Sequence, residues 1–207
     1  MFEFLDEWLI LIVAFGIAVI SPGPDLVMAI RNSILGSRTA GIFTAFGFGL
    51  GVCVHVIYSL VGISALIAQS VMLFTIIKYM GAAYLIFIGI KALKSKGFKM
   101  DKTNKNSEKI KMTALQGLCR GFITNLLNPK ATMFFLALFT QLLDPQTPIS
   151  VQIAFGVTCV VMCTSWFCFV AIVLTNEKIQ KRFIGFTKWI DRLCGGLLVA
   201  LGIRLAM

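Results

Sequence analysis

The stretch Ser21-Pro22-Gly23-Pro24-Asp25 interrupts an apolar segment that runs from Trp8 to about Ile30. Its prolines and glycine remove backbone hydrogen bonds that a continuous helix needs, and Asp25 places a charge where charge is costly. Such a run is either a loop between two short helices or a membrane helix that is deliberately broken. The composition of the remaining chain decides between these two interpretations.

The composition is that of a membrane protein. Hydrophobic residues make up 58% of the 207 residues and charged residues 14%, whereas soluble domains have roughly half apolar and a quarter charged residues. A soluble core of this size could not bury so much apolar surface. The lipid bilayer is therefore the predicted solvent, and several segments reach the roughly 20 apolar residues that a transmembrane helix needs.

Six apolar segments are predicted to form transmembrane helices. The first has acidic residues before it and no small-residue cleavage site, so we expect it to remain as a span and not to be a signal peptide. The predicted helices cover residues 8–30, 41–67, 72–93, 118–143, 149–174 and 184–206.

The positive charges predict the orientation of these helices. Lysines are concentrated in residues 94–112, between the third and fourth helices, and such loops stay in the cytoplasm. Six crossings then place both termini outside. The net charge of +10 follows from this topology, and we expect no nucleic-acid partner because the basic residues do not form an aromatic-interleaved surface.

The two halves of the chain each begin with a proline-broken helix. Pro22-Gly23-Pro24 breaks the first helix, and Asn128-Pro129-Lys130 breaks the fourth. Because each half has three crossings, the second half enters the membrane from the opposite side, as in many secondary transporters. The predicted fold is all-α, with inverted three-helix repeats over 1–93 and 113–207 and a basic cytoplasmic linker over 94–112.

The two breaks are the candidate binding site, because unpaired backbone groups at membrane depth are tolerated where they line a cavity. Asp25 is expected to bind a substrate ammonium or a coupling proton, and Lys130 to attract a carboxylate. Alternatively, these two residues form a structural ion pair, or Lys130 snorkels to the interface. The nearby asparagines either contact substrate or stabilise the turn. The predicted site comprises Pro22, Gly23, Pro24, Asp25, Asn125, Asn128, Pro129 and Lys130.

Three further features have simpler interpretations. Gly47 and Gly51 form a G-x-x-x-G pattern that favours close helix packing over a pore lining. His55 either packs as a hydrogen-bonded side chain or carries protons. The six cysteines lie in apolar segments without metal-ligand spacing, so we expect buried thiols, no metal and no disulfide. No catalytic or nucleotide-binding motif is visible, so neither an enzyme nor a cofactor is predicted.

Several stretches resemble the LysE/RhtB family of bacterial amino-acid exporters. They are residues 21–25, residues 36–41 before the glycine-rich second helix, residues 81–89, and Gly121-Phe122-Ile123-Thr124-Asn125-Leu126-Leu127-Asn128-Pro129-Lys130. The resemblance implies an inner-membrane exporter driven by the proton motive force, from the branch that exports homoserine, threonine and neutral amino acids. The implied partners are a small amino acid, protons and the lipid bilayer.

Two other functions stay open from the sequence. A membrane thiol-disulfide electron carrier would need two cysteines near the helix breaks. A passive channel or metal-ion permease would need oxygen ligands beyond Asp25. Whether the chain forms a homo-oligomer is also left open. The prediction is a secondary transporter that exports a small neutral amino acid by proton antiport.

Overall fold

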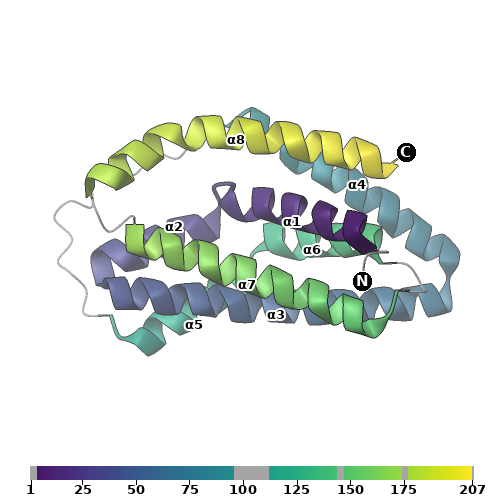
Figure 1. Ribbon diagram of the computed structural model, residues 1–207, viewed down its shortest axis with the longest axis horizontal. Coiled ribbons are helices and arrows are strands. Elements are labelled where there is room, and N and C mark those ends of the chain that lie inside the picture. The colour runs from purple at the N-terminus through teal and green to yellow at the C-terminus, as the bar shows by residue number, and fades with distance from the viewer. Residues whose placement is uncertain (1–3, 96–111, 144–146, 174–176, 207) are drawn as a thin grey trace.

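The fold is a bundle of helices (Figure 1). The computed structural model describes residues 4–95, 112–143, 147–173 and 177–206, and these residues contain no strand. The all-α prediction is therefore confirmed for the described residues. The elements are α1 (Leu5–Ile20), α2 (Pro24–Arg31), the π-helix η2 (Asn32–Gly36), α3 (Arg38–Gln69), α4 (Val71–Leu93), α5 (Ala114–Leu126), α6 (Pro129–Leu142), α7 (Ile149–Val173) and α8 (Glu177–Ala206).

Both predicted helix breaks are confirmed. The pair α1 and α2 bends by 56° at the first break, and the pair α5 and α6 bends by 59° at the second. In each case a proline begins the second helix of the pair, where its missing N–H removes no intrahelical bond. The bends therefore lie where the prolines stop one helix and start the next.

The described helices account for three of the six predicted membrane crossings, or for five if each bent pair is one span. Three stretches are long and apolar enough to cross singly, namely Arg38–Ile63, Thr75–Leu93 and Ile149–Val173, and each bent pair supplies one more. The chain is thus a multi-pass membrane protein. The sixth crossing stays a prediction: α8 is not among these spans, and it begins at Glu177, before the predicted start at 184. Most of the predicted linker, residues 96–111, lies outside the described residues.

Small residues set the distances between the long helices. A Cβ added at Gly47 would collide with the backbone of α5 near Leu118, and one at Gly121 would collide with the Thr44 carbonyl group. One at Gly51 would meet Asn125. These contacts confirm the predicted helix packing of Gly47 and Gly51. They also show that α3 and α5 run parallel, because the contacts advance in the same direction along both helices.

The helices α4 and α8 form a second close pair, and they lie side by side in Figure 1. A Cβ at Gly89 would meet the Gly195 carbonyl oxygen at 2.8 Å, and one at Gly195 would meet the Gly89 carbonyl oxygen at 2.5 Å. At Gly202 the added atom would lie 2.9 Å from the Ala82 carbonyl oxygen. Since the contacts advance along α4 as they recede along α8, this pair is antiparallel.

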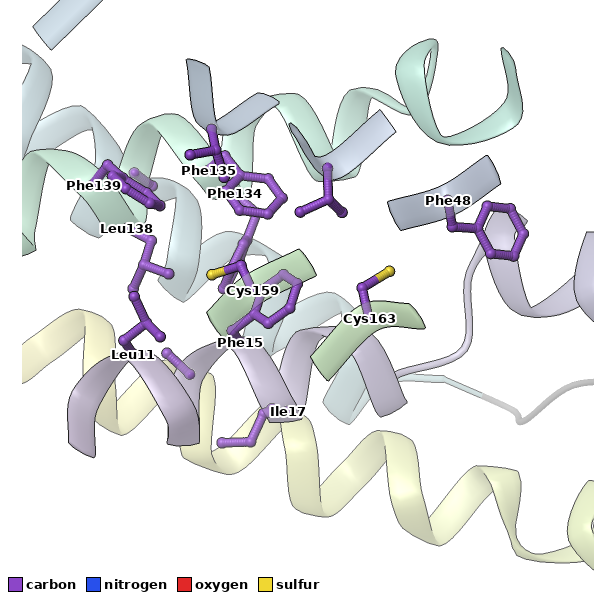
Figure 2. Close-up of a cluster of buried hydrophobic side chains, with 14 of the residues drawn as sticks. Leu11, Phe15, Ile17, Phe48, Phe134, Phe135, Leu138, Phe139, Cys159 and Cys163 are labelled. Carbon is purple, nitrogen blue, oxygen red and sulfur yellow. The ribbon is translucent and has the colours of Figure 1, made fainter. Parts of the chain in front are cut away.

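Aromatic side chains fill the interior between α1, α6 and α7 (Figure 2). The ring of Phe15 lies 5.3 Å from that of Phe135 and 6.2 Å from that of Phe134, centre to centre. Cys159 and Cys163 are buried beside them as predicted, whereas Cys119 is exposed. Large apolar side chains also cover much of the outer surface, which suits contact with lipid.

The start of α1 and the end of α8 lie toward the same end of the bundle (Figure 1). The starts of α3, α5 and α8 lie at the opposite end. A chain that crosses a membrane an even number of times has its termini on one side, and this arrangement agrees with that requirement.

The close packing of α3 and α5 leads to a stability prediction. Gly121→Ala should lower the free energy of unfolding by about 1–3 kcal/mol, because overpacking forces the two backbones apart. Gly196→Ala is the matched control, since nothing lies within 4 Å of an added Cβ there, and it should be neutral or slightly stabilising. Unfolding of the purified protein by SDS titration measures both. Equal stabilities of the two variants would contradict the packing.

Candidate functional site

A cavity lies where the two helix breaks meet, and residues from α1, α2, α3, α5, α6 and α7 line it. Its volume is about 50 Å³, which is space for roughly four water-sized groups. Five of the eight predicted site residues line the cavity. These are Gly23, Asp25, Asn125, Asn128 and Lys130.

The three prolines of the predicted site have a different role. Pro22, Pro24 and Pro129 do not line the cavity; they shape the breaks that surround it. Ser21 lines the cavity in addition to the predicted residues. The apolar wall could not be predicted, since isolated apolar residues on five different helices do not indicate a shared cavity. That wall includes Phe15, Leu26, Val52, Phe134, Phe135 and Phe167.

Asp25 stands at the second position of α2, at the mouth of the first break. Its Oδ2 atom accepts a hydrogen bond of 2.8 Å from Asn125 Nδ2. Its Oδ1 atom is buried and has no hydrogen-bond partner among the described residues. A buried charged acceptor without a partner is costly, so this oxygen is suited to a donor that enters the cavity.

Lys130 crosses from the second break to the first. Its Nζ atom donates to the carbonyl oxygens of Ala18 and Ser21, both at 3.3 Å. A Cβ added at Gly23 would lie 3.7 Å from the same Nζ atom, which is an ordinary contact distance. Lys130 therefore donates hydrogen bonds to carbonyl groups that have no helical partners at the end of α1.

Within the described part of the chain, Asp25 and Lys130 do not form a direct ion pair. The alternative of a structural pair between the two halves is therefore not seen. Each charge is instead held by polar groups of the opposite half of the chain. An ammonium has three N–H donors, and two of those of Lys130 are used, so one donor and one acceptor remain on the two sides of the cavity.

The two asparagines have distinct roles. Asn128 caps α6, because its Oδ1 atom accepts from Lys130 N at 3.0 Å. Asn125 is buried and links the halves through its bond to Asp25. The Asn125 carbonyl oxygen lies 3.0 Å from His55 Nε2, and the other ring nitrogen of His55 lies 2.9 Å from the Tyr58 hydroxyl. His55 is thus a packed side chain with a hydrogen-bond contact at each ring nitrogen.

Metal and thiol chemistry gain no support from these residues. The described residues contain no cluster of three or more His, Cys, Asp or Glu side chains that could hold a metal ion. Of the six free cysteines, Cys163 is the one whose described position lines the cavity. A dithiol mechanism at the cavity needs two cysteines there, and the described lining contains one.

Comparison with known proteins places this architecture in a family. The model of the LysE type translocator family matches residues 15–207. A membrane protein of Vibrio cholerae is 32% identical over 68% of this chain and 67% of its own. One of Bacillus subtilis is 28% identical over 90% and 91%. The threonine efflux protein of Escherichia coli K12 is 25% identical over 91% and 92%.

No solved structure matches this chain. The family match, however, covers both proline breaks and nearly all the helices that surround the cavity. The chain belongs to the family of LysE type translocators.

Proposed function

We propose that this protein exports a small neutral amino acid, such as threonine or homoserine, across the bacterial inner membrane in exchange for protons. The family and the relatives named threonine efflux proteins support an amino-acid exporter. The geometry of the cavity supports the neutral class of substrate.

The observation that carries this proposal is the pair of opposite, incompletely bonded groups in one cavity. The Asp25 carboxylate has a buried acceptor oxygen without a hydrogen-bond partner among the described residues. The Lys130 ammonium bonds to two carbonyl oxygens and has a third donor. An amino-acid zwitterion complements both groups, because its ammonium bonds to Asp25 and its carboxylate to Lys130. The N-terminus of α2, which no side chain caps, adds favourable dipole charge for that carboxylate.

The charge balance favours a neutral amino acid over a basic one. The lining contains the Asp25 carboxylate and the Lys130 ammonium, and a zwitterion satisfies both. A lysine substrate would bring a second cation, for which the lining has no second carboxylate. The small volume and the aromatic wall suit a short side chain.

The proposed topology has six crossings in two inverted repeats, with both termini outside. The similarity of the two breaks supports this topology, since the bends of 56° and 59° lie at equivalent places in the two halves. The antiparallel α4 and α8, which are the third helices of the halves, also support it: the Gly89–Gly195 approach has a counterpart between Ala82 and Gly202. A pseudo-two-fold axis in the membrane plane requires such paired contacts.

Transport by the purified protein tests the function directly. Proteoliposomes loaded with labelled threonine, homoserine or leucine should release at least one of them faster than protein-free vesicles do when a pH gradient is imposed. Collapse of the gradient by an ionophore should slow the release. The proposal fails for these substrates if all three leave at the rate of the protein-free control.

Asp25→Asn should weaken substrate binding by about 10-fold to 100-fold, because a hydrogen bond to a charged group contributes about 1.5–3 kcal/mol. The substituted amide still has an oxygen that can accept from Asn125, so folding should persist. Asp6→Asn is the control, because Asp6 is an exposed carboxylate on α1. Competition by unlabelled substrate in proteoliposomes measures the affinity. An unchanged affinity in the Asp25 variant excludes its role.

Lys130→Met should also reduce transport by about tenfold or more, because it removes the donor for the carboxylate and leaves two carbonyl groups unpaired. Lys188→Met, at an exposed position of α8, should transport normally. The esterified substrate provides a sharper readout, since it lacks the carboxylate charge. If Lys130 binds that charge, the wild type should discriminate against the ester and the variant should not; equal discrimination by both proteins would contradict the assignment.

A further inference from the structure

A chain of three hydrogen-bond contacts runs from one side of the second helix break to the other. His55 Nε2 lies 3.0 Å from the Asn125 carbonyl oxygen, and His55 Nδ1 lies 2.9 Å from the Tyr58 oxygen. The Tyr58 hydroxyl in turn donates to the Thr132 carbonyl oxygen at 3.2 Å. The two ends of the chain are therefore both main-chain carbonyl groups, which accept hydrogen bonds but cannot donate them.

This chain of contacts needs one more proton than neutral side chains supply. Each of the three contacts requires a hydrogen atom, whereas a neutral imidazole carries one N–H and a phenol carries one O–H. With the imidazole neutral, Nε2–H donates to Asn125. The single phenolic proton then serves either Nδ1 or Thr132. A proton added at Nδ1 completes all three bonds, because the imidazolium donates from both nitrogens and Tyr58 accepts one bond while donating the other.

The ends of the chain belong to the two helices that the break separates. Asn125 lies in the last turn of α5, and Thr132 lies in the first turn of α6. Both are bonded through side chains of α3, which runs past the break. With His55 protonated, α5 and α6 are both bonded to α3. With His55 neutral, Nδ1 competes with the Thr132 carbonyl group for the single Tyr58 proton, so the bond to α6 is weakened.

The surroundings of His55 act on its charge in opposite directions, because burial disfavours the imidazolium whereas an aromatic face and a nearby carboxylate favour it. The side chain is 1% exposed, and the ring stacks on Phe135 at 5.6 Å with an angle of 10° between the planes. An aromatic face attracts a cation. On α2, the charged group that interacts with the imidazole is Asp25. Lys130 of α6 and the Cys163 thiol of α7 line the adjoining cavity. The titratable neighbour on α3 is Tyr58.

We propose that His55 and Tyr58 form the binding site of the coupled proton, and that its occupancy fixes the break between α5 and α6 in the conformation described here. The proton binds at His55 Nδ1 and leaves from the same atom, so no covalent bond other than this N–H bond is made or broken. Asn125 connects this site to the substrate site, since its carbonyl group faces His55 while its amide bonds to Asp25. This inference rests on the proposed proton-coupled export.

The sole histidine of the sequence makes the proton directly observable. Protein labelled with ¹⁵N-histidine gives one imidazole spectrum, which should change from a singly to a doubly protonated ring as the pH falls from about 8 to about 5. Tyr58→Phe should alter the Nδ1 signal far more than the Nε2 signal. A ring that stays singly protonated over this range would overturn the proposal, whatever the transport activity.

Transport measurements separate coupling from substrate binding. His55→Gln retains an amide N–H that can donate to Asn125 but cannot take up a proton. It should reduce the acceleration of efflux by a pH gradient about tenfold more than it reduces substrate exchange at equal pH, in line with ordinary coupling energies. Ser59→Ala is the control, because the Ser59 hydroxyl is buried on α3 without a described hydrogen-bond partner, and it should change neither rate.

The outcomes also distinguish this inference from the proposed function. If the wild type does not transport, the proposed export fails. If the wild type is accelerated by the gradient and His55→Gln is accelerated equally, the export stands and the proton site is wrong. If the glutamine variant does not fold, Tyr58→Phe decides: a normal acceleration by the gradient together with an unchanged ¹⁵N spectrum overturns the proposal.

Discussion

The need to pair backbone polar groups at membrane depth is the constraint on which this structure depends. An unpaired peptide group costs several kcal/mol in hydrocarbon, yet prolines interrupt two helices of this bundle. The structure offsets that cost with hydrogen bonds between the residues at each break and residues of the other half of the chain. Lys130 donates to carbonyl groups at the end of α1, and Asn125 donates to Asp25 at the start of α2. The binding cavity is the space that this mutual arrangement leaves.

Glycine makes the polar contacts between the two halves possible. Gly51 has no room for a side chain because Asn125 lies against it, and the same Asn125 bonds to Asp25 and faces His55. A larger residue at position 51 would push α5 away from α3 and would separate these groups. Helix packing and site geometry are therefore one problem in this protein: the small residues that hold the helices close also set the distances between the polar side chains.

The proline breaks could be predicted from the sequence because their cause is local. A proline ends a helix before its own position and can begin the next one. The predicted ends of the helices at 72–93 and 149–174 agree with α4 and α7 to within one residue. The start of α8 was missed since apolar windows exclude charged residues, whereas a helix continues beyond the membrane interface without regard to hydropathy.

The partners of the site residues could not be predicted for a different reason. Lys130 and His55 both bond to main-chain carbonyl groups, and every residue type has such a group, so no letter in the sequence marks them. The sequence suggested a pairing of Asp25 with Lys130 only as an alternative, because opposite charges are visible in it. The contact between His55 and Tyr58 is the one contact of this group that the sequence could indicate, since residues three apart share a helix face.

The single carboxylate of the site explains why a proton and a substrate would oppose each other. An imidazolium at position 55 and a substrate ammonium in the cavity are both cations, and both are attracted to Asp25. Each therefore weakens the binding of the other, and by linkage the effect is equal in both directions. Mutual weakening is the sign that exchange across a membrane requires, because the site then releases its solute when a proton arrives. A second acidic residue in the cavity would reduce this opposition and would favour movement of both cations together. A lone carboxylate among the described lining residues thus favours the proposed antiport over symport.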